Sequence, residues 1–359
     1  MKKPKETLKK LRKRIDSIDS SIVELLSSRA CVSQDIGNIK RAKEMDIYSP
    51  DRESDVYDKV LARNEGPLSD DSMKAVYREI MSGTLALEGP LKVAYLGPKA
   101  TFTHQASLEK FGSSVEYVSS STITDVFREV DSARATYGVV PIENSIEGAV
   151  NHTLDMFVDF NLKICSEIYL EISHNLMARC GLKKIKIIYS KAEVFGQCRN
   201  WLEKNLPLVE LVEVSSTTRA AEIASSKKNA AAIASFLASE VYGLRISAKG
   251  IEDSAHNVTR FLVISRKLYP QPTRKDKTSI VFSVKDRVGA LHDMLVPFKK
   301  NNVNLTKIES RPSKERAWDY YFFADLEGHI TSEKLRRAVS ALEKGCTYLK
   351  ILGSYPAGK

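Results

Sequence analysis

The longest regular pattern in the chain is an apolar stripe near its N-terminus, and it limits the possible folds most strongly. Apolar residues recur at alternating intervals of three and four through residues 7–43, which predicts one long helix with coiled-coil-like packing. Proline and glycine residues then delimit two shorter helices, at about 51–63 and 69–87. Three such helices lack a closed core, so we expect a second copy of the chain to pair with them.

Cations interrupt or flank this stripe. Arg29 occupies one of its core positions, and Lys40 lies three turns further along nearly the same face. Arg12 precedes Arg29 by roughly 25 Å of helix at 1.5 Å per residue, so both cannot reach one small ligand from the same helix. The three cations can act together only if Arg12 comes from the partner in an intertwined dimer. The alternative is a snorkelling or salt-bridged arginine at position 29.

From residue 91 onward, short runs rich in β-branched residues alternate with helical periodicity. This predicts α/β units with mostly parallel strands, arranged in two small lobes. Polar residues follow four of the strands, and because such positions share one edge of a parallel sheet, we expect a carboxylate-binding cleft there. Each is also an ordinary helix cap, and Ser190 and Glu193 have the spacing of a capping box. The four stretches are GPKATFTHQA at 97–106, VVPIENSIEG at 139–148, YSKAEVFGQC at 189–198 and SSTT at 215–218.

The run NVTRFLVI, residues 257–264, carries an arginine into the beginning of an otherwise apolar strand. A buried charge needs a partner, which can be a structural carboxylate or a ligand. If strand alternation already holds there, Thr259 and Arg260 point to opposite faces. They can then share one ligand only if the chain is still turning at Arg260.

The last segment follows a linker at 269–277 and shows elements in the order β-α-β-β-α-β, which is typical of a ferredoxin-like domain. Five dispersed cysteines without a CxxC pair predict reduced thiols, no metal site and a cytoplasmic location. The chain lacks an 18-residue apolar span and a signal-peptide pattern, so we expect no membrane partner. Of the net charge of +10, +9 lies in residues 266–359 as scattered residues, so nucleic-acid binding is not expected.

The N-terminal residues resemble the all-helical chorismate mutase domain, with expected bounds 1–89. The resemblance rests on LRKRIDSIDSSIVELLSSR, on IK at 39–40 and on YSPDRE at 48–53. It implies rearrangement of chorismate to prephenate without a covalent bond to the protein. Lys40 is implied at the ether oxygen, Glu53 at the substrate hydroxyl, and Lys40 and Glu88 as the catalytic residues. The implied substrate-binding set is Arg12 (from the partner), Arg29, Lys40, Ser49, Arg52, Glu53, Thr84 and Glu88.

Two departures from that family concern polar contacts. Ser49 replaces a common aspartate, and Glu88 stands where some members carry glutamine. A glutamate donates a hydrogen bond only when it is protonated, so mutase activity should fall as Glu88 ionises.

Residues 90–268 resemble prephenate dehydratase, a two-lobed α/β domain similar to periplasmic binding proteins. The Thr-Arg-Phe triplet at 259–261 is the most specific match. The resemblance implies loss of CO2 and the ring hydroxyl from prephenate, with Thr259 as the catalytic residue at the leaving hydroxyl and Arg260 at a carboxylate. Ala100 replaces a usual glycine, so its loop should avoid positive φ. The implied binding set is Thr101, Asn144, Ser145, Ser190, Gln197, Thr259, Arg260 and Phe261.

Residues 276–359 resemble an ACT domain, through GALHDML at 289–295 and ESRP at 309–312. In that family these motifs line a phenylalanine site between two protomers, which implies Gly289, Ala290, Leu291, Glu309, Ser310 and Arg311 as effector-binding residues. The alternative without the resemblance is a turn glycine and an edge-strand ion pair.

Together the three resemblances imply a bifunctional cytoplasmic enzyme that makes phenylpyruvate from chorismate and is inhibited by L-phenylalanine. A homodimer or homotetramer is expected, with no cofactor and no metal. Three alternatives stay open: an arogenate dehydratase, a non-catalytic amino-acid sensor with a vestigial mutase domain, and a basic RNA-binding module.

Overall fold

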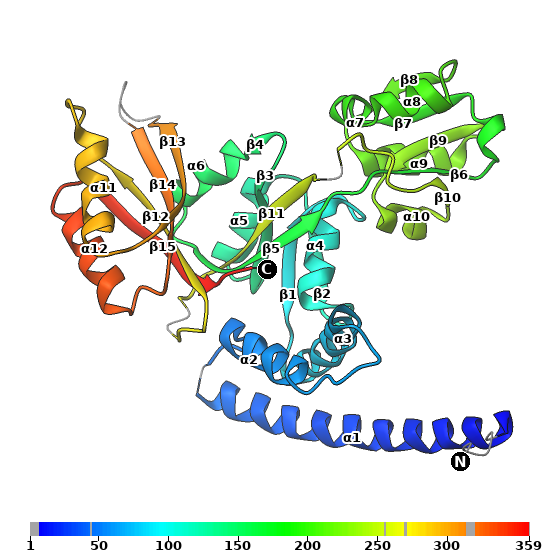
Figure 1. Cartoon of the computed structure of the whole chain (residues 1–359), viewed down its shortest axis with the longest axis horizontal. Helices are drawn as coiled ribbons and strands as arrows, with labels where there is room; N and C mark the ends of the chain where they lie inside the picture. Colours follow the sequence, from blue (N-terminus) through cyan, green and yellow to red (C-terminus); the bar gives the residue numbers. More distant parts are fainter. Residues whose placement is uncertain (1–6, 44, 255, 269–270, 314–319, 359) are drawn as a thin grey trace, which may run out of the picture. The chain divides into compact units, whose positions relative to one another are not determined.

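The structure is a computed structural model, and it describes residues 7–43, 45–254, 256–268, 271–313 and 320–358. The chain forms two compact units. One unit contains the described residues up to Ser49 together with Tyr57–Leu91 and Phe111–Glu116, and the other contains the remaining described residues. Figure 1 labels the elements of both.

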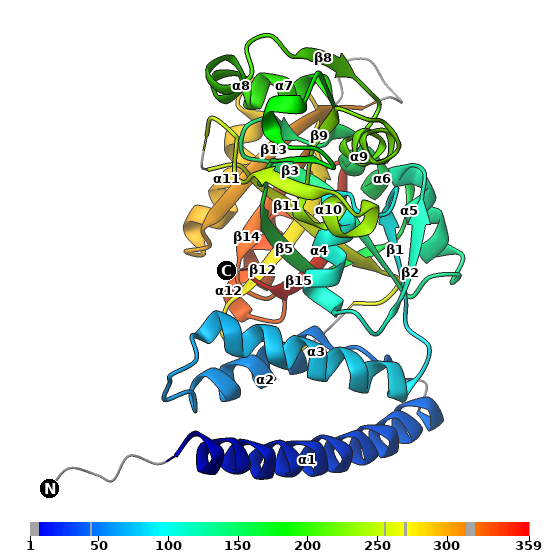
Figure 2. The ribbon, with the colours of Figure 1, turned by 90° about the vertical axis from the view of Figure 1, so that its right-hand side faces the viewer.

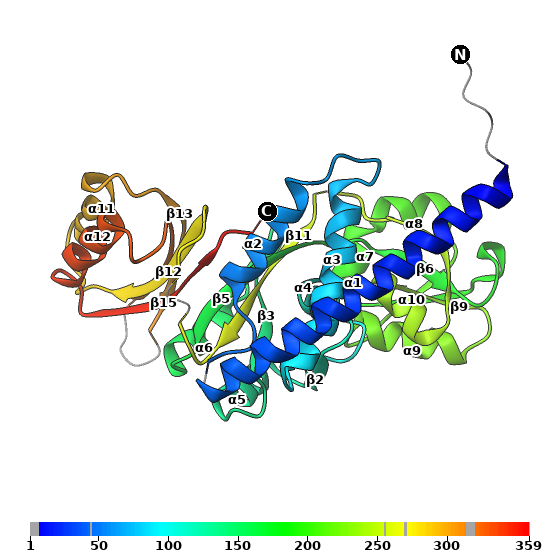
Figure 3. The same cartoon turned by 90° about the horizontal axis from the view of Figure 1, so that it is seen from below.

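Three helices at the N-terminus confirm the predicted helical segment: α1 Leu8–Ala42, α2 Pro50–Leu61 and α3 Asp70–Glu88. The first is continuous, as Figure 2 and Figure 3 show. Gly37 lets α1 approach α3 closely, because a Cβ there would lie 2.7 Å from the Cα of Glu88. The apolar stripe of α1 is nevertheless largely exposed, between 42 and 70% for Leu8, Leu11, Ile15, Ile18, Ile22, Leu25, Val32, Ile36 and Ile39. In the described part of the chain, no helix could cross a membrane.

The first α/β lobe surrounds a sheet with the strand order β2-β1-β3-β11-β5, and β4 pairs with β3. Its helix α5 begins with a capping box between Thr122 and Asp125. The buried core of this lobe lies between α5, α6 and the sheet. Its elements are β1 Lys92–Leu96, α4 Phe102–Phe111, β2 Glu116–Ser120, α5 Ile123–Asp131, β3 Tyr137–Asn144, β4 Gly148–Ala149, α6 Asn151–Asp159, β5 Lys163–Glu171 and β11 Val258–Ser265.

The second lobe has a sheet with the order β10-β6-β9-β7-β8. The chain enters it through residues 172–174 and returns through residues 249–257, so two crossing segments join the lobes, as Figure 1 shows. This confirms a two-lobed α/β domain. Its elements are β6 Asn175–Ala178, the 3₁₀ helix Leu182–Lys184, β7 Ile187–Ser190, α7 Ala192–Gln197, α8 Arg199–Asn205, β8 Glu210–Glu213, α9 Thr217–Ser226, β9 Ala230–Ala234, α10 Phe236–Tyr242 and β10 Arg245–Ala248.

The expectation of mostly parallel strands is only partly correct. β1 and β3 pair in parallel, as do β7 with β8 and β7 with β9. The strand β11, however, is antiparallel to both of its neighbours, β3 and β5. This direction places the beginning of β11 beside the end of β3, where Thr259 pairs with Asn144. The polar end of β3 and the start of the Thr-Arg-Phe run therefore meet at one sheet edge.

The C-terminal domain confirms the predicted βαββαβ order, with the sheet order β13-β14-β12-β15. Helices α11 and α12 cover one face of the sheet (Figure 1), where Ile280 and Phe282 belong to their core. The opposite face presents Val281 and Phe323 to the core of the first lobe. Its elements are β12 Asp276–Ser283, α11 Ala290–Lys300, β13 Leu305–Pro312, β14 Tyr320–Glu327, α12 Glu333–Glu343 and β15 Tyr348–Pro356.

The loop before α4 contradicts one expectation. Ala100 adopts a φ of 70°, in the left-handed region that an alanine was expected to avoid. Its backbone is held from two sides, because its N–H donates to His104 Nδ1 at 3.1 Å and its carbonyl accepts from Ser235 Oγ at 2.9 Å. The side chain is fully buried. These contacts offset the strain that glycine would have avoided.

Candidate active site

Two pairs link α1 to α3 within the helical unit. Arg29 donates to the hydroxyl of Thr84 at 2.7 Å, and Lys40 forms an ion pair with Glu88 at 2.8 Å. Lys40 also contacts the carbonyl of Ile47. The side chains of Lys40 and Glu88 are only 19 and 10% exposed, so the pair is shielded from water. Glu88 thus accepts a hydrogen bond from an ammonium group in this structure, whereas the sequence prediction has it donate one.

The remaining mutase candidates lie apart from these pairs. Arg12 is exposed and belongs to the same continuous helix as Arg29, as the distance argument requires. Ser49 is the N-cap residue of α2 but makes no side-chain capping bond. Arg52, with a side chain that is 64% exposed, lies 3.8 Å from Asp55. Glu53 forms an ion pair with Lys110 at 2.6 Å, and both residues belong to the larger unit.

In the dehydratase candidate region, Thr259 and Asn144 form a direct contact whose direction can be assigned. The Oδ1 atom of Asn144 accepts backbone N–H groups from Ile146 at 2.9 Å and Glu147 at 3.0 Å. Its Nδ2 must therefore point the other way, where it donates to Thr259 Oγ1 at 2.8 Å and to Asn257 Oδ1 at 2.7 Å. The threonine hydroxyl is the acceptor in this contact, and its own hydrogen is left for another group.

Gln197 extends this cluster between the lobes. Its Oε1 lies 2.8 Å from Nε2 of His174 and 3.3 Å from Nδ2 of Asn257, and its Nε2 donates to Glu147 Oε1 at 3.0 Å. The ring of Phe102, at the start of α4, lies 5.7 Å from that of His174. Burial lowers the pKa of His174, which favours the neutral imidazole. Both crossing segments and both lobes thus contribute to one hydrogen-bonded group.

The other dehydratase candidates have local structural contacts. Thr101 Oγ1 donates to the carbonyl of Leu96 at 3.0 Å, and Ser145 Oγ donates to that of His256 at 2.9 Å. Ser190 is fully buried and donates to the carbonyl of Ile233 at 2.9 Å, so it does not join the cluster. Phe261 is buried.

Two capping expectations have different outcomes. The capping box predicted at Ser190 and Glu193 is wrong, because Lys191 is the N-cap residue of α7 and makes no side-chain capping bond. In the SSTT stretch, Ser216 caps α9 by accepting the backbone N–H of Arg219 at 3.0 Å. That serine therefore has the structural role of an ordinary helix cap.

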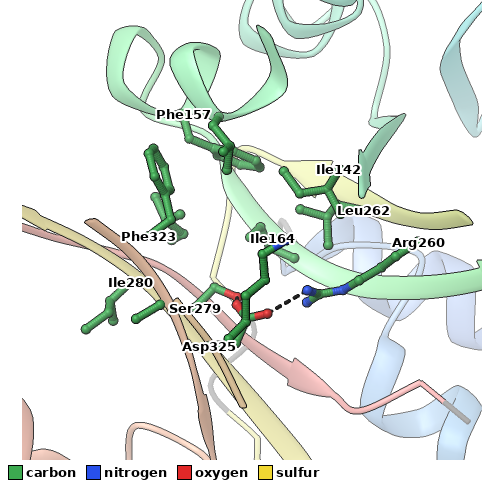
Figure 4. A pocket seen from close by; sticks show the side chains of 13 residues that line it. Ile142, Phe157, Ile164, Arg260, Leu262, Ser279, Ile280, Phe323 and Asp325 are labelled. Atoms are coloured by element: carbon green, nitrogen blue, oxygen red, sulfur yellow. Dashed lines mark hydrogen bonds and ion pairs between the residues drawn. The ribbon is translucent and has the colours of Figure 1, made fainter. Parts of the chain in front are cut away.

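Arg260 requires the clearest correction. Strand alternation holds at this position, so its side chain leaves Thr259 and enters the interface with the C-terminal domain. Its guanidinium contacts Glu167 at 2.8 Å, Asp325 at 2.6 Å and the hydroxyl of Tyr355 at 3.1 Å, with a side chain only 6% exposed. Figure 4 shows the Arg260–Asp325 pair between the two sheets. The arginine therefore has structural carboxylates as partners, in place of the substrate carboxylate that we expected.

A cavity of about 490 Å³ adjoins Gln197 and Asn257. Four carboxylates line it, and no cation is among its described lining residues: Glu147, Glu193, Glu252 and Asp253, with Ile146, Gly196, Gln197, Ser254 and Asn257. Such a lining disfavours a dianion. Thr259 does not line this cavity, so a dicarboxylate would have to approach the hydroxyl from another side of the cluster.

In the C-terminal domain the two effector motifs lie apart. Gly289, at a φ of 77°, precedes α11, and Gly289, Ala290 and Leu291 line a cavity of about 260 Å³ with Tyr320 and Phe322. The described residues of the second motif, Glu309, Ser310 and Arg311, are not among its lining residues. Arg311 instead forms a bidentate ion pair with Asp155 of α6, at 3.0 Å to each oxygen.

Two members of the cluster around Thr259, His174 and Asn257, were not predicted from the sequence. Both lie in the crossing segments, which carry no regular periodicity. Asn257 stands two residues before Thr259, and this proximity is the one signal that could have indicated it.

Comparison with known proteins places the chain among enzymes of one family. Family models match for chorismate mutase type II at residues 11–89, prephenate dehydratase at 93–268 and the ACT domain at 278–344. The bifunctional chorismate mutase/prephenate dehydratase of Aquifex aeolicus is 51% identical over 98% of both chains, and that of Stutzerimonas stutzeri is 45% identical over 98% of both.

Solved structures agree with these matches. The prephenate dehydratase of Arthrobacter aurescens in complex with L-Phe has a TM-score of 0.70 and 32% identity, covering 74% of this chain and 90% of that one. The prephenate dehydratase of Staphylococcus aureus has a TM-score of 0.65 and 29% identity, covering 74% and 100%. The chain therefore belongs to the family of bifunctional chorismate mutase/prephenate dehydratases.

Proposed function

We propose that the chain performs the two reactions of its family at separate sites, with Thr259 as the hydrogen-bond donor to the leaving hydroxyl of prephenate. The observation that carries this proposal is the direction of the Asn144–Thr259 contact, in which the threonine oxygen accepts and its hydrogen is left over. An amide donor on the oxygen also polarises the O–H bond, which makes the hydroxyl a better donor.

The dehydration needs such a donor because hydroxide is a poor leaving group. The bond between the ring and its carboxylate breaks, its electron pair completes the aromatic ring, and the C–O bond to the hydroxyl breaks. CO2 and hydroxide leave, and hydroxide takes one proton to become water. Thr259 has no useful acidity of its own, so in this proposal it stabilises the charge growing on the departing oxygen while the proton comes from the solvent.

For the mutase we retain the predicted roles, with bounds of 1–89 for this domain. Lys40 would stabilise charge on the ether oxygen, and Arg29 would bind a carboxylate. Each must exchange its present partner, Glu88 or Thr84, for a substrate group. The Lys40–Glu88 pair supplies a physical reason for Glu88, because an ion pair holds the ammonium where it is needed before the substrate arrives.

The exposed stripe of α1 supports a homodimer through this helix. Nine large apolar side chains on one helix exceed what a soluble surface usually leaves uncovered. A partner copy would cover the stripe and supply Arg12 to the site of Arg29. Arg12→Ala and Arg29→Ala mutants would test this arrangement: each is inactive as a mutase alone, and a mixture regains part of the activity through sites without either change.

For the domains at 90–268 and 276–359, we propose inhibition by L-phenylalanine through the cavity beside Gly289. Aromatic side chains of Tyr320 and Phe322 suit a phenyl ring, and the glycine leaves room for an amino acid to approach the backbone. Arg311 connects the second motif to α6 of the dehydratase lobe through Asp155, which offers a path for the effect.

One assay tests the whole proposal. Chorismate is supplied, and prephenate and phenylpyruvate are followed with and without L-phenylalanine. We expect both products and a slower second step with the effector, and Thr259→Ala should lower dehydratase kcat by orders of magnitude with mutase activity intact. Failure to form phenylpyruvate would contradict the proposal. Because the Arabidopsis relative named arogenate dehydratase/prephenate dehydratase 2 is 36% identical, arogenate is supplied in a parallel arm to decide between the two substrates.

A further inference from the structure

We propose that Asn257 is a positioning residue for the dehydration, which fixes the direction in which Thr259 presents its hydroxyl hydrogen. The inference rests on the role proposed above for Thr259. Asn257 makes no contact with Thr259 that would explain such a role directly. It acts through Asn144, whose amide hydrogens contact both side chains.

The first step of the argument begins at Glu147. An ionised carboxylate can only accept hydrogen bonds, so the group of Gln197 that faces it must be the NH2 group. The Oε1 of Gln197 then faces Asn257 as an acceptor, which requires that Asn257 present its Nδ2. The remaining oxygen of Asn257 therefore faces Asn144 and accepts from it at 2.7 Å.

The second step starts at the opposite end of the cluster. Two backbone N–H groups hold the oxygen of Asn144, so its NH2 group faces both Asn257 and Thr259. This assignment uses only backbone donors, whose direction is not open to choice. Both ends of the cluster thus give the same direction at every contact, and the direction at Thr259 is determined twice.

His174 strengthens the assignment. Because Oε1 of Gln197 accepts, Nε2 of His174 must carry the hydrogen, and burial lowers the pKa of this imidazole. Its Nδ1 is then an acceptor, and it is buried without a hydrogen-bond partner among the described residues. A second hydrogen on Nδ1 would be equally unpaired there, so the neutral form with the hydrogen on Nε2 is retained.

Burial explains why Asn257 matters for this direction. The residue is only 4% exposed, and its carbonyl accepts the backbone N–H of Ile172 at 2.8 Å, so the two crossing segments hold it in place. Without its side-chain oxygen, one hydrogen of Asn144 loses its partner. The amide can then twist away from Thr259, and the hydroxyl can rotate its hydrogen toward Asn144 instead of the substrate.

The test compares Asn257→Ala with Asn257→Asp, which keeps an acceptor oxygen for Asn144. We expect Asn257→Ala to lower dehydratase kcat by roughly tenfold to hundredfold, with KM for prephenate changed less than about threefold. Asn257→Asp should recover most of that loss in kcat. The matched control is Asn205→Ala, in an exposed asparagine of α8 that bonds only to the carbonyl of Trp201 among its described contacts.

A double-mutant cycle separates positioning from a general loss of structure. If Asn257 acts through the hydroxyl of Thr259, then Asn257→Ala should cost little further activity in a Thr259→Val background. Equal losses in both backgrounds, or an unchanged kcat in Asn257→Ala, would overturn the inference. Failure of the proposed function looks different, because Thr259→Val would then itself retain dehydratase activity.

Discussion

Replacement of Arg260 by methionine gives the sharpest test of the interface between the dehydratase and C-terminal domains. The guanidinium neutralises Glu167 and Asp325, whose side chains are 0 and 9% exposed. Lys277 remains beside Glu167 at 2.8 Å, so Asp325 becomes the uncompensated charge. Loss of one partner from a buried pair costs about 3–5 kcal/mol of unfolding free energy. Burial opposes the charge of Arg260, but Tyr355 and the carboxylates outweigh it and raise its pKa.

The assay is a urea titration of the full chain, followed by circular dichroism. Asp325→Asn keeps both oxygen and hydrogen-bonding shape and should cost less, about 1–2 kcal/mol. The Arg260→Met/Asp325→Asn double mutant should be at least about 1.5 kcal/mol more stable than the sum of single losses predicts, because it removes the stranded charge. Arg199→Met is the control, since that arginine pairs with Glu203 on the exposed surface and should leave the midpoint unchanged.

One result would refute this reasoning. If Arg260→Met costs less than about 1 kcal/mol and raises KM for prephenate strongly, the arginine binds substrate and its buried carboxylates are secondary. A large loss of stability with mutase activity retained supports the structural assignment.

Three further predictions concern local backbone and charge. Ala133→Gly should raise the unfolding free energy by about 0.5–1 kcal/mol, because this exposed residue has a φ of 61°, whereas Ala100→Gly should change it little, because loss of a buried methyl offsets the relief of strain. Burial chiefly lowers the pKa of His104 to about 4, so the wild type should lose about 1–2 kcal/mol between pH 6.5 and 4 that His104→Asn does not lose, after allowance for solvent screening. The unfolded imidazole gains its proton first in that range, and pH-dependent urea midpoints measure the difference. Gly353→Ala should lower stability by about 1–3 kcal/mol, because its Cβ would lie 2.0 Å from a carbonyl oxygen of β5, whereas Gly181→Ala meets nothing within 4 Å.

Local patterns predicted the elements that depend on local physics. The stripe at 7–43 predicted a helix that the structure places at Leu8–Ala42, because helical periodicity is a property of neighbouring residues. The βαββαβ order of the last segment followed from the same kind of signal. Strand direction was less accessible, since β11 pairs with strands far away in sequence and its own residues do not record which way they run.

The site shows the same division. Alternation in β11 correctly offered opposite faces for Thr259 and Arg260, but the partners of the arginine lie 93 and 65 residues away and have no sequence signature. The backbone of Ala100 depends on a serine 135 residues away, and that contact outweighs the local preference against positive φ. Asn257 and His174 lie outside any periodic segment, so only the folded crossing segments bring them together.

The alternation of β11 has a consequence for folding fidelity. A slip of one residue would turn the Arg260 charge toward the amide group of Asn144 and leave a threonine hydroxyl against the carboxylates Glu167 and Asp325. Both faces of the strand would then lose free energy together, so no slipped pairing could recover on one face what it lost on the other. An inserted residue within β11 should therefore be far less tolerated than one in the crossing segment before it, and the strand discriminates against its own misfolded registers.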